Sequence, residues 1–193
     1  MPGRGCVELI VAGALLFAAP TPPSRGQVQV IDREYEIKAA YLYNFGLYVQ
    51  WPRGSVPTEQ EEFVIGVLGK DVFDSNLDKL ATAKKVQGRK IVIHRFKSMA
   101  DYKPCHILFI SRSAAEGNKE SPEDRLAEAM QKLKNKPVLL VAESNGLAMK
   151  GAMINLFVEE NRVKFEVNPG AGKQAGLQMS SKLLQLGKVV PKE

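Results

Sequence analysis

Four short apolar runs stand out in the pattern of hydrophobic and polar positions in the middle of the chain. They are rich in Val, Ile, Leu and Phe, as strands buried on both faces are. Stretches with helical spacing of apolar residues lie between them. The runs are 63–69, 90–96, 105–111 and 137–144, and the helical stretches are 71–85, 98–102 and 121–134. This alternation predicts a mostly parallel sheet with helices on both faces.

A helix is predicted over residues 31–49, before the first apolar run. Asp32 suits its N-cap, and apolar side chains recur every three to four residues along it. Trp51-Pro52 ends the helix, because the residue before a proline disfavours helical geometry. The predicted buried stripe is Ile37, Tyr41, Phe45, Tyr48 and Val49.

The C-terminal part of the chain breaks the alternation of strands and helices. Residues 153–167 contain two apolar runs around the polar segment 159–162, which predicts an antiparallel hairpin. A closing amphipathic helix is predicted over 171–189. Its expected buried stripe is Met179, Leu183, Leu186 and Val190. The predicted fold class is therefore α/β, with a mostly parallel sheet, helices on both faces, a C-terminal antiparallel hairpin and a closing helix.

Residues 1–26 predict a signal peptide. An apolar run, Leu9–Ala19, follows a single basic residue, Arg4, and precedes a Pro-rich tail. Such a run is too short for a transmembrane helix, which takes about 20 apolar residues. No later run approaches that length. Residues 27–193 are therefore predicted to form one exported α/β domain in the periplasm, without a transmembrane segment.

The charge of the chain gives little indication of its partners. The formal net charge of +6 is modest for 193 residues, and the basic residues are scattered. Their densest group is Lys84, Lys85, Arg89 and Lys90, with no interleaved aromatic residues. Nucleic-acid binding usually combines a basic patch with stacking aromatic residues, so no nucleic-acid partner is predicted. The oligomeric state stays open, and a homodimer is compatible with the sequence.

Cys105-His106 is the stretch that most suggests catalysis. Neighbouring side chains of a strand point to opposite faces, so these two cannot form a nucleophile–base pair if both lie in the strand. His94, the only other histidine, belongs to the preceding apolar run. One thiol and two separated histidines also lack the spacing of metal ligands. The chain is therefore predicted not to be an enzyme, with no cofactor and no metal.

Five aromatic residues fall within residues 41–51. A helix that packs on one sheet needs only part of its circumference to be apolar. Tyr43 and Trp51 are therefore surplus, and surplus aromatic side chains are typical of protein interfaces. Packing at the domain edge is the alternative, because tyrosines often lie half-buried. Tyr43, Tyr48 and Trp51 are the predicted partner-binding residues.

Six segments, taken in order, resemble the YfiR family of small exported bacterial proteins, and they cover about residues 34–190. They are "EYEIKAAYLYNFGLYVQWP", "IGVLGKDVF", "VQGRKIVIHRF", "CHILFIS", "GAMINLFVEENRVKFEVN" and "AGLQMSSKLLQLGKVV". The resemblance implies a noncatalytic periplasmic regulator. Such a regulator binds and represses the periplasmic sensor region of an inner-membrane diguanylate cyclase, which lowers cyclic-di-GMP and biofilm formation.

The cysteines depart from the pattern of the redox-sensitive family members. Those members use cysteine pairs, one of which joins the "CHILFIS" strand to another strand. Here Gly66 stands in the neighbouring strand, and Cys6 would leave with the signal peptide. An internal disulfide is therefore not expected. Cys105 is expected to be a buried apolar residue, with an intermolecular disulfide as the alternative.

The alternative function is a periplasmic small-ligand-binding module that serves another membrane receptor or kinase. In parallel α/β sheets, ligands lie beyond the carboxyl ends of the strands. Those ends are expected at residues 69–71, 111–113 and 143–145. A hydrolase is a third hypothesis, with Ser111 or Cys105 as the candidate nucleophile.

Overall fold

The computed structural model describes residues 25–54 and 62–190, with side chains from residue 33 on. The helices are α1 (Arg25–Tyr48), α2 (Asn76–Ala83), the 3-10 helix η1 (Met99–Asp101), α3 (Pro122–Lys132), α4 (Pro169–Gln174) and α5 (Ser181–Leu186). The strands are β1 (Val49–Gln50), β2 (Glu62–Leu68), β3 (Lys85–Val86), β4 (Arg89–Phe96), β5 (Ile107–Ile110), β6 (Leu139–Ala142), β7 (Ile154–Glu159), β8 (Arg162–Val167), β9 (Gln178–Met179) and β10 (Lys188–Val189).

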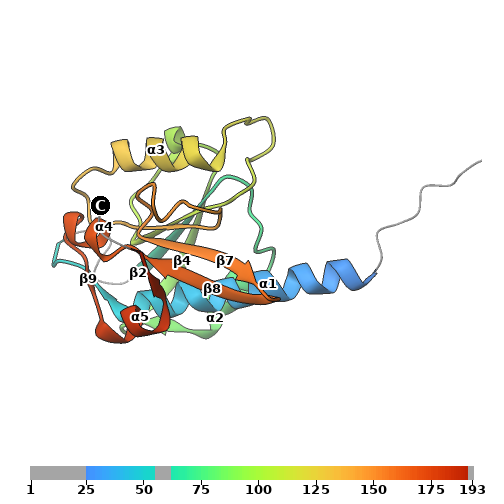
Figure 1. Ribbon diagram of the computed structural model, residues 1–193, viewed down its shortest axis with the longest axis horizontal. Helices are drawn as coiled ribbons and strands as arrows, with labels where there is room; N and C mark the ends of the chain where they lie inside the picture. The colour runs from blue at the N-terminus through green and yellow to red at the C-terminus, as the bar shows by residue number, and fades with distance from the viewer. Residues whose placement is uncertain (1–24, 55–61, 191–193) are drawn as a thin grey trace, which may run out of the picture.

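Eight strands form one sheet in the order β10-β8-β7-β6-β5-β2-β4-β3. The β7–β8 and β3–β4 pairs are antiparallel, and the other pairs in this sheet are parallel. Helix α3 lies on one side of the sheet, and α1 and α2 lie on the other (Figure 1). The predicted fold class is therefore confirmed.

The central strands are buried on both faces. Every residue of β5 and β6 is buried, as is every residue of β2 after Glu62. Parallel strands covered by helices on both sides need apolar side chains at every position. This requirement is the physical reason for the uninterrupted apolar runs in the sequence.

The start of α3 follows a sequence signal for helix initiation. The hydroxyl of Ser121 accepts a hydrogen bond from Asp124 N at 3.1 Å, and Asp124 Oδ2 accepts one from Ser121 N at 3.2 Å. Pro122 occupies the first turn, where its missing N–H leaves no bond unmade. The hydrogen bonds from Ser121 lower the pKa of the Asp124 carboxyl. This capping box fixes the beginning of the helix.

The turn between β7 and β8 has the geometry of a two-residue hairpin connection. Glu160 and Asn161 both have positive φ, 51° and 59°. Two such residues in succession match the twist of antiparallel strands. The predicted hairpin is therefore present, with its turn within the expected polar segment, 159–162.

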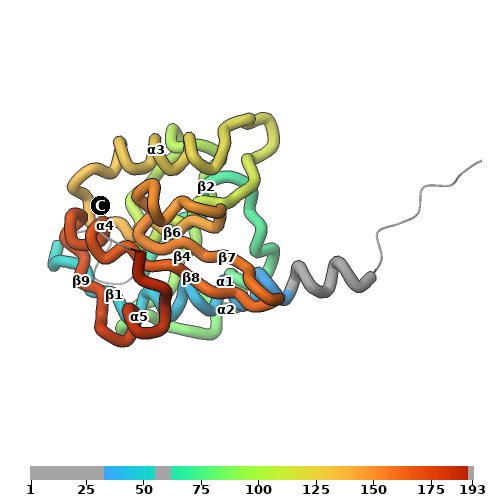
Figure 2. The backbone as a smooth tube through the Cα atoms, in the orientation of Figure 1, coloured from blue at the N-terminus to red at the C-terminus, as the bar shows by residue number. Residues whose placement is uncertain are grey.

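The region predicted as one closing helix is divided into α4, β9, α5 and β10. Gly176 adopts φ +76° after α4, and Ser180 caps α5 by accepting a hydrogen bond from Leu183 N. Between the two helices, β9 pairs antiparallel with β1, and the two strands lie side by side in Figure 2. Leu183 and Val190 of the predicted stripe are buried, whereas Leu186 is 61% exposed. The stripe fails at Leu186 because the helix is interrupted.

The predicted stripe of α1 is confirmed at Phe45 and Val49, which are buried, but is wrong towards the start of the helix. Ile37 is 38% exposed, and Tyr41 and Tyr48 are only partly buried. The helix is rotated so that Lys38 faces inward. The buried residues of α1 are Tyr35, Lys38, Ala39, Leu42, Phe45 and Gly46, and Val49 of β1 continues the same buried set.

The predicted signal peptide lies outside the described residues, apart from its last two positions. Helix α1 begins at Arg25, so a cleavage after Gly26 would fall in its first turn. Among the described residues, no helix is long and apolar enough to span a bilayer.

Candidate functional site

The carboxyl ends of β5 and β6 meet where a parallel sheet would usually bind a ligand. Glu143 follows β6, and its side chain is fully buried. Its Oε2 lies 2.5 Å from Nζ of Lys38 on α1. Its Oε1 accepts a hydrogen bond from the backbone N of Arg112, after β5, at 2.9 Å. These contacts tie α1 to the ends of both strands.

The buried charges at this end of the sheet are compensated. Lys38 is 1% exposed and also contacts Glu34 Oε1 at 2.5 Å. The hydroxyl of Tyr35 lies 3.5 Å from Glu143 Oε1. Burial, followed by the negative charge of Glu143, raises the pKa of Tyr35. The tyrosine therefore stays neutral and donates to the carboxylate.

Arg125 of α3 closes the same end of the sheet from the other face. Its side chain is fully buried and donates to the carbonyl of Ser111 at 2.6 Å and to the carbonyl of Glu120. Burial lowers the pKa of this guanidinium, which remains protonated at neutral pH. Lys38 and Arg125 are therefore bonded to Glu143 and to the Ser111 carbonyl, in two of the loops where the sequence suggested a ligand as an alternative.

The loop after β2, at residues 69–71, is also held by the fold. Gly69 N donates to the carbonyl of Phe96, and Lys70 N donates to the carbonyl of Ser113. Gly69 has φ +100°, and a Cβ there would lie 2.6 Å from the Ser113 carbonyl oxygen. Only glycine fits this close approach between the two loops.

The three residues predicted to bind a partner, Tyr43, Tyr48 and Trp51, lie at the C-terminal half of α1 and just beyond it. All three are partly buried against the core. Trp51 Nε1 donates to the carbonyl of His106 at 3.2 Å, and Lys182 Nζ lies 5.1 Å from the centre of the Tyr48 ring. These contacts position the side chains of Trp51 and Tyr48, and the role of all three residues in an interface stays a prediction.

Cys105 and His106 precede β5, which begins two residues later than the predicted strand. Their side chains have different neighbours. Cys105 Sγ lies 4.0 Å from the hydroxyl of Tyr102. His106 Nδ1 accepts a hydrogen bond from Val64 N at 3.0 Å, and its ring stacks on Phe63 with centroids 4.6 Å apart. The arrangement does not bring thiol and imidazole together as nucleophile and base.

We expect the thiol of Cys105 to react with a water-soluble disulfide reagent only when the protein unfolds. The side chain is fully buried, and burial raises its pKa to about 12, so thiolate is scarce at neutral pH. The measurement compares the rate at which Cys105 reacts with the reagent in the protein of residues 27–193, with and without denaturant. Equal rates would contradict this expectation. A non-reducing gel after mild oxidation tests the intermolecular disulfide, for which we expect monomer only.

Within residues 25–54 and 62–190, no group of three or more His, Cys, Asp or Glu side chains is arranged to hold a metal ion. His94 lies in β4, and its ring is 6.1 Å from that of Phe96. His94 lies in β4 and His106 lies just before β5, and the ring of each is close to an aromatic ring. Both are therefore parts of the packing of the sheet.

The fold is that of an α/β protein in which buried polar side chains hold helices to the ends of β5 and β6. Lys38 and Glu143 connect α1 to these ends, and Arg125 connects α3 to the end of β5. A family model matches residues 35–188, and the chain belongs to the YfiR/HmsC-like family. This membership supports a periplasmic regulator in cyclic-di-GMP signalling, in a family that is regulatory and noncatalytic. No curated protein matches the chain.

Two solved structures are distantly similar. One is a conserved domain protein from Vibrio cholerae O1 biovar El Tor, with a TM-score of 0.45, 10% identity and coverage of 81% of this chain. The other is an ABC domain from Streptococcus pneumoniae in complex with L-Trp, with a TM-score of 0.42, 9% identity and coverage of 66% of this chain. The chain spans 60% and 56% of their respective lengths. These similarities carry no conclusion about function.

Proposed function

We propose that this protein is exported to the periplasm and represses an inner-membrane diguanylate cyclase by binding its periplasmic sensor region. The observation that carries the proposal is the family match over residues 35–188, which takes in almost the whole described domain. Repression lowers cyclic-di-GMP and biofilm formation.

Such a repressor works through a difference in affinity. It binds the inactive conformation of the cyclase more tightly than the active one, and each difference of about 1.4 kcal/mol shifts the ratio of the two about tenfold. No covalent step is needed. The ion pairs that fix α1 against β5 and β6 supply a rigid surface for this purpose, because a preordered surface loses little entropy on binding.

We place Tyr43, Tyr48 and Trp51 in the contact with the cyclase. Each presents part of an aromatic ring to solvent while the remainder packs on the core. Partly buried aromatic side chains are common energetic centres of interfaces because they are already held in place.

The proposal is tested by deleting the gene in the source bacterium and measuring intracellular cyclic-di-GMP. We expect deletion to raise the level, because an unrestrained cyclase is active. Expression of residues 1–193 should lower it again, whereas residues 27–193, without the predicted signal, should not. An unchanged level after deletion would contradict repression of a cyclase. Full rescue by residues 27–193 would contradict a periplasmic site of action.

A second candidate is a small-ligand-binding module for another membrane receptor. It is favoured by an apolar groove of about 580 Å³ between α3, β6 and α4, a size suited to a small molecule. Its apolar lining includes Met130, Leu133, Val138, Leu140 and Met153. Unchanged cyclic-di-GMP after deletion, together with thermal stabilisation by a periplasmic metabolite, would favour this candidate.

A further inference from the structure

The outer edge of β4 lacks a partner strand over most of its length. β3 pairs only with the first two residues of β4, Lys85 with Lys90 and Val86 with Arg89. Residues 91–96 pair with β2 on the inner side, and no strand of the described chain pairs with them on the outer side. An edge of this length, about 20 Å, is enough to take an added strand.

The hydrogen bonds of the sheet identify which backbone groups face outward. The carbonyl of Phe96 accepts from Gly69 N at 3.0 Å, so Phe96 faces inward, towards the β2 side. In a strand, the N–H and C=O of one residue point to the same side, and the side alternates along the chain. Ile93 and Arg95 therefore present their N–H and C=O groups outward. An added strand would bond to these groups.

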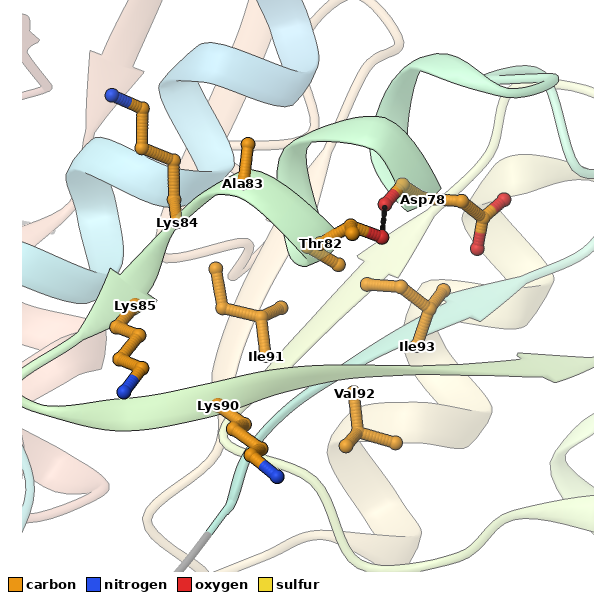
Figure 3. Close-up of a pocket in the computed structure, with 10 residues that line it drawn as sticks. Asp78, Thr82, Ala83, Lys84, Lys85, Lys90, Ile91, Val92 and Ile93 are labelled. Atoms are coloured by element: carbon orange, nitrogen blue, oxygen red, sulfur yellow. Dashed lines mark hydrogen bonds between the residues drawn. The ribbon is translucent and has the colours of Figure 1, made fainter.

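A groove of about 510 Å³ runs along this edge, between β4 and the C-terminal half of α2. Figure 3 shows Ile91 and Ile93 pointing from β4 towards α2, whereas Val92 points to the opposite face. Ala81 of α2 also lines the groove. Alternate side chains of an added strand would therefore meet an apolar surface on the α2 side of the sheet.

The end of the groove beside β3 is positively charged. Lys84, Lys85 and Lys90 line it, and all three are exposed. None of them forms an ion pair with another described residue. Further along β4, the charge of Arg95 is compensated by two aspartates at 2.5 and 2.6 Å. A segment that binds along the edge therefore needs negative charge at the β3 end.

We propose that the outer edge of β4, residues 91–96, binds an extended acidic segment of a partner protein as an added strand. The inference rests on the proposed function and deepens it, because the segment belongs to the sensor region of the repressed cyclase. The segment is about six residues long. It places apolar side chains at alternate positions beside Ile91 and Ile93, and acidic side chains beside the three lysines of the groove.

Charge favours this partner over a second copy of the chain. β4 has no acidic residue, and the two aspartates beside it are already paired with Arg95, so the β4 edge of a second copy would not supply the negative charge that the three lysines require. The edge also adjoins the aromatic end of α1. Arg89 Nη1 lies 3.1 Å from His106 Nε2, and Trp51 donates to the carbonyl of the same histidine. One partner could therefore cover both surfaces.

The test measures cyclic-di-GMP in the deletion strain that expresses variants of the full chain. Ile93→Pro removes an outward-facing N–H and places a ring where the added strand would bond, a change that an edge strand tolerates. A second variant combines Lys84→Glu, Lys85→Glu and Lys90→Glu and repels an acidic segment. We expect both variants to leave cyclic-di-GMP at the level of the deletion strain.

Each variant has a matched control that should restore the low level. Val189→Pro places proline at the opposite edge of the sheet, where the adjacent Val190 N bonds inward to β8 and Val189 faces outward. The charge control replaces three exposed lysines that do not line the groove. It combines Lys103→Glu, Lys119→Glu and Lys136→Glu.

The outcomes separate the two proposals. If the unaltered protein does not lower cyclic-di-GMP, the proposed function and the edge proposal are both overturned. If the unaltered protein and the charge-reversal variant lower it equally, the edge proposal is overturned and the proposed function stands. Immunoblots and thermal unfolding check that each variant is folded. If Ile93→Pro unfolds, the charge-reversal variant decides, because its three lysines are exposed.

A second copy at the edge gives a different result. Ile93→Pro would then convert a dimer to a monomer in solution while cyclic-di-GMP stays low. This result would overturn the proposal of an acidic partner.

Discussion

Replacing Lys38 by methionine is expected to lower the free energy of unfolding by about 3–5 kcal/mol. The change leaves the carboxylate of Glu143 fully buried without the ammonium group that lies 2.5 Å from it. A buried charge that loses its partner is far more costly than an exposed one. Thermal unfolding measures the effect, and we expect the midpoint to fall by about 10 °C.

The matched control is Lys164→Met. Lys164 lies at the same distance, 2.5 Å, from Glu159, but both side chains are exposed. Exposed pairs contribute about 0–1 kcal/mol, so this variant should unfold close to the unaltered protein. A second substitution, Glu143→Gln, should recover part of the loss in the Lys38→Met protein, because it removes the unpaired charge. Equal small effects of both methionine substitutions would contradict a structural role for the buried pair.

The strands could be predicted from the sequence because burial on both faces leaves a local signal. β2 is shifted by one residue from the predicted run 63–69. β5 lies within the predicted run 105–111 but begins two residues later. The start of α3 could also be predicted from the local sequence, because Ser121 and Asp124 bond to each other within one turn. These features depend on neighbours in the sequence, which a pattern of residue types records.

The inward position of Lys38 on α1 could not be predicted in this way. Lys38 lies in the buried face because Glu143, 105 positions further on, accepts its charge. Hydropathy assigns a lysine to solvent, so the pattern favours a stripe through Ile37 instead. The attachment of α1 to the end of β6 therefore depends on a long-range ion pair. Neither Lys38 nor Glu143 is recognisable as a buried residue when its sequence position is considered alone.

The β4 edge is a similar case. The lysines at 84, 85 and 90 are visible in the sequence as part of its densest basic group. Their common groove depends on the strand order, in which β3 covers only the beginning of β4. Composition gives the charge of such a surface, and only the topology gives its shape and its free hydrogen-bonding groups.

Replacing Gly66 by cysteine is expected to create an internal disulfide with Cys105. A Cβ at position 66 would lie 3.2 Å from Cys105 Sγ, close to the distance of about 3 Å that a disulfide with an S–S bond of about 2.05 Å requires. The bridge would close a loop between positions 39 apart, for which chain entropy gives a stabilisation of about 4 kcal/mol. We therefore expect the oxidised variant to unfold about 10 °C above its reduced form.

The reduced variant should be less stable than the unaltered protein, because the new Cβ would lie 2.8 Å from Phe96 Cε2 and 3.0 Å from Leu108 Cδ1. Gly66→Ser is the matched control, since it adds the same crowding without a second thiol and should not respond to oxidant. Mass and thiol counts after oxidation measure the bond directly. Two free thiols in the oxidised Gly66→Cys variant of residues 27–193, which lacks Cys6, would contradict the expected geometry.

Formation of the bond would show that one residue separates this chain from a form with an internal redox switch. Gly66 lies beside a cysteine that is already in place just before β5. We expect oxidant to change the unfolding midpoint of the variant and not that of the unaltered protein. The unaltered protein would then have no disulfide switch within its own chain. The release of this regulator from its partner would depend on the contacts between the two proteins.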